Sequence, residues 1–151
     1  MLGVLSREQS EHVLKSEMVG RIGCYAAGKV YVVPVTYVFY DDHIYAHSKE
    51  GMKVRMMRKN AKVCFQVQSA ESTRDWRSVI LWGKYEELKT LSEQKKAMKI
   101  LNDRLLPFSL SRSVSYEPNM DPPRRVEKKL KPVIYRITVD EVTGRYEKSG
   151  Q

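Results

Sequence analysis

The sequence lacks the features of a membrane-spanning or exported chain. None of its apolar runs approaches the ~20 consecutive residues that are needed to cross a bilayer. Residues 1–6 do not combine a basic stretch, an apolar stretch and a small-residue cleavage site, as a signal peptide does. We therefore expect a cytoplasmic protein that makes no membrane contact.

Cysteine and histidine are scarce, and their placement argues against metal or disulfide chemistry. The two cysteines, Cys24 and Cys64, lie in separate apolar stretches of strand-like composition, and the three histidines are scattered along the chain. Neither set has the close spacing of a zinc site or of a redox CxxC motif. We expect no metal site, and we expect reduced, buried thiols that pack as small apolar groups.

Acidic residues are outnumbered by basic ones, 18 against 27, which gives a formal net charge of +9. Such a charge suits nucleic acid or an anionic cofactor, and it is equally compatible with a solvated basic surface. The densest basic cluster, within residues 124–131, contains none of the interleaved aromatic residues on which bases stack. We expect no nucleic-acid partner, although charge alone leaves that alternative open.

The first half of the chain reads as one helix followed by strands joined by tight turns. Ser6 and Gln9 have the spacing of a capping box, which opens a helix to about Lys15. Strand-like apolar stretches then cover residues 21–27, 30–40 and 43–46. Turn-forming residues at 28–29 and 41–42 separate these stretches, so an antiparallel meander is predicted.

The second half alternates helices and strands without a βαβ pattern. A helix is predicted over 51–59, strands over 61–68 and 76–88, and a second helix over 91–105. Residues 107–132 hold five of the six prolines and are predicted to be a long loop with at most one helical turn. A strand at 133–139 is extended by 142–146 or pairs with it after a bend. The whole chain, 1–151, is therefore predicted to be a single domain, a small β-barrel with helices outside.

The segment of residues 44–53 has the composition of a phosphate-binding loop. A strand ends at His47 and Ser48, Gly51 permits a tight turn, and Lys53 lies in the first turn of the following helix. Free backbone N–H groups at a helix start, a hydroxyl and a cation commonly hold a phosphate. The same pattern also fits an ordinary strand-to-helix loop with Ser48 as the helix N-cap.

Five motifs, taken in order and spacing, resemble those of the FMN-binding split-barrel superfamily (pyridoxamine 5'-phosphate oxidase-like). The most similar branch is the nitroimidazole-resistance, or flavin-nucleotide-binding, family. The match spans about residues 7–90 and resumes at 133–137 and 143–145. The motifs are Gly20-Arg21-Ile22-Gly23, Tyr31-Val32-Val33-Pro34-Val35-Thr36-Tyr37, His47-Ser48-x-x-Gly51-x-Lys53, Val63-Cys64-Phe65-x-Val67 and Trp76-Arg77-Ser78-Val79-x-x-x-Gly83.

The resemblance implies a mainly β fold, a six-stranded antiparallel split β-barrel of Greek-key type with a few peripheral helices. It also implies a homodimer in which FMN lies in each of two clefts at the subunit interface. The cofactor-binding residues that it implies are Val33, Pro34, Val35, Thr36, His47, Ser48, Lys53, Arg55, Trp76, Arg77, Ser78 and Val79.

The same resemblance suggests a role for each group. Backbone groups of residues 33–36 would bond the polar edge of the isoalloxazine ring, and His47 and Ser48 would lie beside the flavin. Lys53, assisted by Arg55, would meet the phosphate, which a basic side chain binds through a charge-assisted hydrogen bond. Residues 76–79 would lie where oxidase relatives carry a glutamine that contacts the ring, although Trp76 also fits an ordinary packed aromatic.

Three departures separate this chain from the vitamin B6 oxidases. Tyr31 stands where those enzymes begin a strand with a phosphate-binding arginine, and Thr36 stands where they carry a lysine for the substrate phosphate. Their C-terminal Arg-x-His has no counterpart near residues 143–145. We therefore do not expect vitamin B6 oxidation.

The function that the resemblance favours is an FMN-dependent oxidoreductase that reduces a small electrophile such as a nitroaromatic. His47 would be its catalytic residue, because a histidine beside the flavin can donate a proton near neutral pH. A flavin-binding module without turnover, a heme-binding variant of the barrel and a basic nucleic-acid-binding barrel remain as alternatives.

Overall fold

Strands make up most of the protein, and all of them pair antiparallel. The computed structural model describes residues 1–112 and 132–150. Three helices accompany eight strands within this part of the chain. The strands are β1 (Leu2–Val4), β2 (Val19–Ala26), β3 (Lys29–Thr36), β4 (Val38–Tyr40), β5 (His43–Ser48), β6 (Lys62–Ser72), β7 (Asp75–Glu87) and β8 (Val133–Glu147), and the helices are α1 (Arg7–Ser16), α2 (Met52–Lys59) and α3 (Leu91–Arg112).

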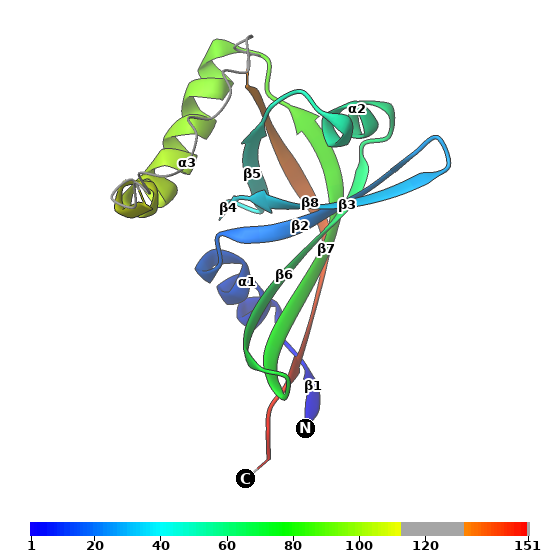
Figure 1. The fold of residues 1–151 in the computed structure, drawn as a ribbon, viewed down its shortest axis with the longest axis vertical. Coiled ribbons are helices and arrows are strands. Elements are labelled where there is room, and N and C mark those ends of the chain that lie inside the picture. Colours follow the sequence, from blue (N-terminus) through cyan, green and yellow to red (C-terminus); the bar gives the residue numbers. More distant parts are fainter. Residues whose placement is uncertain (113–131, 151) are drawn as a thin grey trace, which may run out of the picture.

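The strands form one curved sheet in the order β3-β2-β6-β7-β8-β5-β4, with β1 added beside β8. The sheet does not close, because β3 and β4 at its two ends pair with only one neighbour each. Figure 1 shows the β2–β3 and β6–β7 hairpins leaving the middle of the molecule in different directions. The prediction of an antiparallel split barrel with peripheral helices is confirmed.

Two hairpins have tight turns: the one at 41–42 lies where the sequence predicted it, and the other lies at 27–28, one residue before the predicted 28–29. Ala27 and Gly28 between β2 and β3 have φ of 50° and 75°, and Asp41 and Asp42 between β4 and β5 have 49° and 55°. Left-handed conformations at both central residues are typical of two-residue hairpin turns, whose twist matches that of the flanking strands.

The predicted count of six strands was too low by two. One extra strand is the short β1, and the other arises because the predicted strand at 30–40 breaks at Tyr37. The hydroxyl of the fully buried Tyr37 side chain donates a hydrogen bond to the Leu14 carbonyl, at 2.7 Å. The backbone N–H of Tyr37 donates to the Met18 carbonyl. These bonds hold the chain against α1 and its following turn, so the ladder with β2 ends at Thr36.

Helix α1 fills the inside of the curved sheet, and α3 covers part of the outside. Val13 and Leu14 of α1 pack on the main core, where burial of such a side chain contributes about 2 kcal/mol. A second cluster joins Ala97 and Leu101 of α3 to Val38 and other residues of β4, β5 and β8. None of the helices in the described part of the chain is long and apolar enough to cross a bilayer.

The predicted helices form, with one difference in length. The capping box at the start of α1 is present, with Ser6 and Gln9 each accepting the other's backbone N–H. Helix α3 begins at Leu91 as predicted but continues through Pro107 to Arg112, so residues 107–112 are not loop. A proline inside a helix removes one backbone hydrogen bond, and its ring clashes with the carbonyl four residues earlier, yet α3 continues past Pro107 for five more residues. The remaining predicted loop, including the basic cluster, lies outside the described residues.

The last strands are longer than predicted. Strand β6 continues to Ser72, and β8 is one continuous strand through residue 147, with a bulge opposite Trp82 and Gly83. Both cysteines are free. Cys24 lies in the core, where burial raises the pKa of its thiol, whereas Cys64 is only half-buried, so the prediction of two buried thiols holds for the first alone.

Candidate functional site

The start of α2 leaves backbone donors free, as a bound anion would require. Gly51 is the N-cap, no side chain caps the helix, and its first turn contains no acidic residue. The first intrahelical bond runs from the Arg55 N–H to the Gly51 carbonyl. The N–H groups before it therefore lack partners within the helix and point out of its positive end.

Ser48 does not cap this helix, which settles the alternative left open by its sequence. Its hydroxyl donates instead to the Lys49 carbonyl at 2.9 Å. The loop of residues 49–51 thus separates the end of β5 from α2, and Ser48 lies half-buried at its beginning.

Three of the four cations of α2, Lys53, Arg55 and Lys59, have no ion pair with any residue that the structure describes. Lys53, in the first turn, is half-buried, and Arg55 is exposed. Lys53 lies near enough to Cys24 on β2 to counter, in part, the effect of burial on the pKa of that thiol. A half-buried cation without a carboxylate partner beside free backbone N–H groups is the donor set that a phosphate requires.

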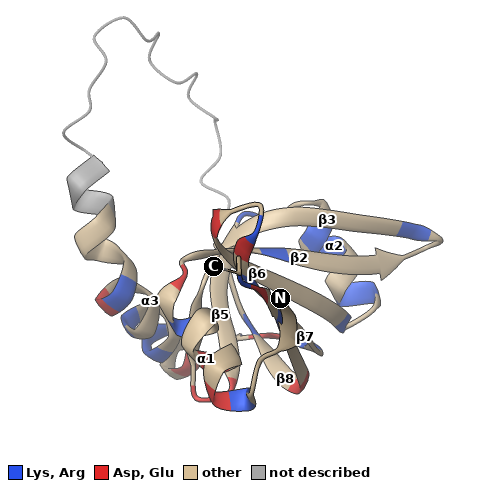
Figure 2. Ribbon diagram, turned by 90° about the horizontal axis from the view of Figure 1, so that it is seen from below, with Lys and Arg blue, Asp and Glu red and all other residues tan. Residues whose placement is uncertain are grey.

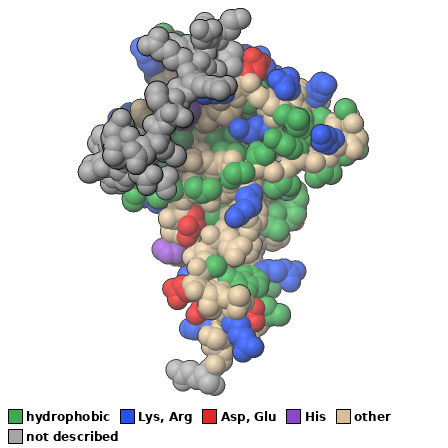
Figure 3. Space-filling view, in the orientation of Figure 1, with side chains coloured by type: hydrophobic (Ala, Val, Ile, Leu, Met, Phe, Trp, Pro, Cys, Tyr) green, Lys and Arg blue, Asp and Glu red, His purple; other side chains and the backbone are tan. Residues whose placement is uncertain are grey.

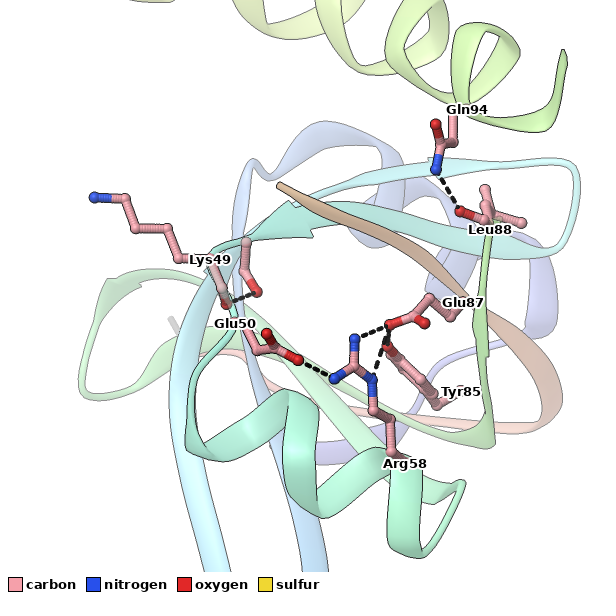
Figure 4. A network of polar contacts seen from close by, with 8 residues as sticks. Lys49, Glu50, Arg58, Tyr85, Glu87, Leu88 and Gln94 are labelled. Carbon is pink, nitrogen blue, oxygen red and sulfur yellow. Dashed lines mark hydrogen bonds and ion pairs between the residues drawn. The ribbon is translucent and has the colours of Figure 1, made fainter. Parts of the chain in front are cut away.

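Arg58, on the same helix, differs because it is fully engaged. Its Nε and Nη2 donate to Oε1 of Glu87 at 3.1 and 2.7 Å, and its Nη1 donates to Glu50 (Figure 4). The Tyr85 hydroxyl donates to the same oxygen of Glu87 at 3.0 Å. These carboxylates raise the pKa of Arg58, so this cation is not available to a ligand in the way that Lys53 is.

Strand β3 offers backbone rather than side-chain groups for part of its length. Val35 is buried and Val33 half-buried in the core, whereas Pro34 and Thr36 lie on the exposed face. Because β3 is an edge strand, one side of its backbone has no strand partner, which also explains how the ladder accommodates Pro34. The residues predicted to bond the flavin ring through their backbone thus lie on a free edge.

His47 has an exposed side chain near the end of β5. It lies opposite Ile134 of β8, on the face of the strand opposite to that of the buried Ala46. The loop that leads to α2 begins two residues later. His47, Ser48, Lys53 and Arg55, which we call the α2 group, thus come from one short stretch of chain at the end of β5 and the start of α2.

The four predicted residues on β7 lie elsewhere. Trp76 and Arg77 line a pocket with Val4 and Gln9, and no residue of α2 lines it. Arg55 instead lines a groove with residues of the β2–β3 hairpin. Within the described part of a single chain, the α2 group and the β7 group therefore lie in separate places.

The side chains of the β7 group are mostly occupied. The Trp76 indole N–H donates to Oε2 of Glu147 at 3.0 Å, and the Ser78 hydroxyl accepts from the side chain of Gln66, also at 3.0 Å. Val79 is fully buried in the core. Only Arg77 projects freely into solvent.

A flat apolar surface, which the sequence reading missed, lies between the two groups. We call it the outer sheet face, and it comprises Tyr25, Val30, Val32, Ile80 and Trp82. Val30 is 71% exposed, Val32 61% and Trp82 41%. Figure 3 shows hydrophobic side chains gathered over the β2–β3 hairpin.

A row across four strands explains why this surface is flat. Val32, Gly23, Cys64 and Trp82 lie side by side in register. A Cβ at Gly23 would come within 2.7 Å of the Cys64 sulfur, so glycine keeps the row level. The sequence feature that could have revealed this surface is the unbroken apolar run at residues 79–82, because such a run indicates a strand with both faces covered.

Comparison with known proteins agrees with this architecture. The family model described as pyridoxamine 5'-phosphate oxidase matches residues 6–146. The crystal structure of an FAD-binding protein from Mesorhizobium loti is 31% identical, covers 99% of this chain and 98% of its own, and superposes with a TM-score of 0.78. An uncharacterised protein of Rhizobium meliloti is 29% identical over 98% of this chain and 97% of its own.

A more distant structure, from Bacteroides thetaiotaomicron and described as a candidate 5-nitroimidazole antibiotic resistance protein, shares the fold. It is 20% identical, covers 97% of this chain and 87% of its own, and has a TM-score of 0.71. The superfamily inferred from the sequence motifs is thereby confirmed. This chain belongs to the pyridoxamine 5'-phosphate oxidase-like family of flavin-binding split barrels.

Proposed function

We propose that the protein is an FMN-dependent oxidoreductase that passes electrons to a small electrophile such as a nitroaromatic. The observation that carries the proposal is the pair of unpaired cations, Lys53 and Arg55, at the uncapped start of α2 in a chain of this family. A flavin phosphate carries close to two negative charges near neutral pH, which matches this donor set.

The other residues of the α2 group would orient the cofactor. Lys53 and the backbone N–H groups of α2 would hold the phosphate, and the free edge of β3 at residues 33–36 would bond the polar edge of the ring. The bound flavin supplies the electron-transfer chemistry. His47, exposed beside the loop, would hold a proton near the acceptor and donate it as the acceptor is reduced.

A second copy of the chain would complete the site. In a single chain the pocket that Trp76 and Arg77 line contains no residue of α2, so Arg77 and Ser78 would reach a flavin bound at α2 from the partner subunit. The exposed apolar residues of the outer sheet face support such a homodimer, since burial in an interface removes them from water. The cofactor would then lie at the subunit interface.

The absorbance spectrum of the purified protein tests this proposal. A flavin spectrum that NADPH bleaches and a nitroimidazole restores is the expected result. A flavin spectrum without turnover would favour a non-catalytic binding module, and a heme spectrum would favour a heme barrel. Colourless protein that retains nucleic acid in a salt-sensitive manner would contradict flavin binding altogether.

FAD is a second candidate cofactor, favoured by a groove beside the phosphate position. The groove, ≈ 320 Å³ in volume, lies between α2 and the tip of the β2–β3 hairpin. Met52 and Met56 line it together with Lys29, Arg55 and Lys59. Figure 2 shows basic positions on α2 and near the tip of the β2–β3 hairpin. An adenine and a second phosphate would fit this combination of sulfur, apolar surface and positive charge.

Titration of the apoprotein with both flavins separates the two cofactors. Binding of FAD at least tenfold tighter than FMN, and loss of that difference in Lys59→Ala, would favour FAD. Equal affinities would show that the groove contributes nothing and that FMN alone suffices.

A further inference from the structure

Glu50 is an unexpected residue so close to a phosphate position, because it directly precedes Gly51, the N-cap of α2. A free carboxylate here would repel a phosphate. It could also accept bonds from the first N–H groups of the helix, as acidic side chains near helix starts commonly do. Either effect would close the site to an anionic ligand.

In the structure the Glu50 carboxylate is turned away from the helix start. Figure 4 shows its side chain directed to Nη1 of Arg58, which lies in the last turn of α2, while Lys49 points to the other side. The charge of Glu50 is thus placed alongside the end of the helix that favours a cation, and away from the end that favours an anion.

Arg58 can hold Glu50 because it is itself fixed to the sheet. Two of its nitrogens donate to Glu87 of β7, whose side chain is only 19% exposed, and Tyr85 donates to the same carboxylate. The remaining terminal nitrogen faces the loop of residues 49–51. A planar guanidinium suits this double role, since it offers donors in several fixed directions.

We propose that Arg58 is a positioning residue of the phosphate site, which holds Glu50 alongside α2 so that the helix start stays open to a phosphate. This inference rests on the proposed flavin function and deepens it. It assigns to the ion-pair network a role in selecting phosphorylated over unphosphorylated flavin. It also explains how an acidic residue is tolerated beside Lys53.

Two variants at position 50 separate the charge of the side chain from its reach. Glu50→Asp keeps the charge but shortens the side chain by one carbon–carbon bond, about 1.5 Å, so that the contact with Arg58 opens. Glu50→Gln keeps the reach and the bond from Arg58 but removes the charge. Both variants leave the Arg58–Glu87 contact in place, and both change an exposed position, so the fold should be retained.

Apoprotein titrated with FMN and, in parallel, with riboflavin gives the readout. We expect Glu50→Asp to weaken FMN binding about three- to tenfold, because one released carboxylate acts on a doubly charged phosphate through partly screened surroundings. Glu50→Gln should bind FMN as tightly as the wild type or more tightly. Riboflavin, which has no phosphate, should bind all three proteins equally.

Glu86→Asp is the matched control. It shortens an acidic partner of another exposed ion pair, with Arg136, on the neighbouring residue of β7. It should leave both affinities unchanged. Three outcomes would overturn the inference. Glu50→Asp could bind FMN as tightly as the wild type, or Glu50→Gln could weaken FMN binding as much as Glu50→Asp does. Alternatively, riboflavin binding could fall together with FMN binding. Wild-type protein that binds no flavin at all would instead contradict the proposed function, and the inference with it.

Discussion

At the scale of single residues, availability to a ligand depends on the partners that the fold provides. Lys53 and Arg58 lie on the same short helix, yet only Arg58 meets carboxylates. The reason is the direction of each side chain, since Arg58 projects towards β7 and Lys53 towards β2. An unpaired, half-buried cation is costly to keep without a ligand, which is why Lys53 is the better candidate.

Replacement of Lys53 by alanine should weaken FMN binding roughly ten- to hundredfold, the loss expected for one charge-assisted bond. Riboflavin affinity should hardly change, because only the phosphate is lost as a partner. Isothermal titration of the apoprotein with both ligands measures this. Lys59→Ala, at the other end of α2, is the control and should bind FMN normally. Unchanged FMN affinity in Lys53→Ala would remove the phosphate assignment.

His47 should affect turnover and not binding. It is exposed, and it packs into neither core cluster of the described residues. His47→Ala should therefore keep a normal flavin content and melting temperature, while reoxidation of the reduced flavin by a nitro compound slows by about 10²–10⁴, the usual contribution of a proton donor. Stopped-flow absorbance measures the rate.

His43→Ala provides the comparison for that experiment, because His43 lies at the other end of β5, where its ring contacts the Asp41 carbonyl and Tyr45. Its reoxidation rate should match the wild type. A stable, fully yellow His47→Ala protein that reoxidises at the wild-type rate would show that His47 has no catalytic role.

At the scale of elements, two consecutive residues at the end of β7 bind two other elements, strand β8 and helix α2. Glu86 accepts two bonds from Arg136 of β8, and Glu87 accepts from Arg58 of α2. Successive side chains of a strand point to opposite faces, so one strand end can hold a neighbouring strand and a helix at once. The position of α2, and with it the phosphate site, is thus coupled to the sheet.

This coupling predicts a loss of stability in acid. The bond from Arg136 lowers the pKa of Glu86. Burial raises the pKa of Glu87, but the bonds from Arg58 and Tyr85 outweigh burial, so the pKa of Glu87 lies below the ordinary 4.5. A carboxylate with a lowered folded pKa stabilises fully above its unfolded value, and that stability is lost as pH falls through the folded value. We expect the unfolding midpoint in urea to drop between about pH 5 and pH 3.

Glu87→Gln tests which group is responsible. This variant should be less stable than the wild type at pH 7 and should lose less stability on acidification, because the titrating group is gone. Chemical denaturation at several pH values gives both numbers. A wild-type midpoint that does not change between about pH 5 and pH 3 would contradict the assignment.

At the scale of the whole molecule, the open sheet has an apolar face that nothing in the described part of the chain covers. Helix α3 contacts the β4–β5–β8 side of the sheet and not this face. Within these described residues the outer sheet face is exposed, and the two groups of predicted flavin residues lie apart. A second copy of the chain packed on this face would remove it from water and would bring the β7 group of one subunit to the α2 group of the other.

Val32→Glu places a charge in the middle of that face and should convert a dimer to a monomer, since an unpaired charge is costly to bury. Flavin content should fall as the dimer dissociates, because the partner subunit would no longer contribute residues to the site. Light scattering after gel filtration measures the oligomeric state. The ratio of absorbance at the flavin band to the absorbance of the protein measures the flavin content. Leu91→Glu, at an apolar position of α3 that is 67% exposed, is the control and should stay dimeric. A monomeric wild type with full flavin content would exclude the shared site.

Local interactions are what the sequence by itself determined. The capping box at Ser6, the hairpin turns at 27–28 and 41–42, and the helix that begins after Gly51 all depend on contacts within a few residues, so their patterns are readable from the chain. The loop with His47 and Lys53 belongs to this class, since its residues are neighbours in sequence. Family resemblance added the flavin expectation to the same short segments.

Only the tertiary structure decided the features that depend on distant partners. The strand break at Tyr37 needs the Leu14 carbonyl, and the engagement of Arg58 needs Glu87, 29 residues away. Trp76 meets Glu147 across 71 residues, which removes its indole N–H from the predicted site. No periodicity encodes such pairings, because they arise from the order of strands in the sheet. That order also separates the β7 group from α2 and exposes the outer sheet face.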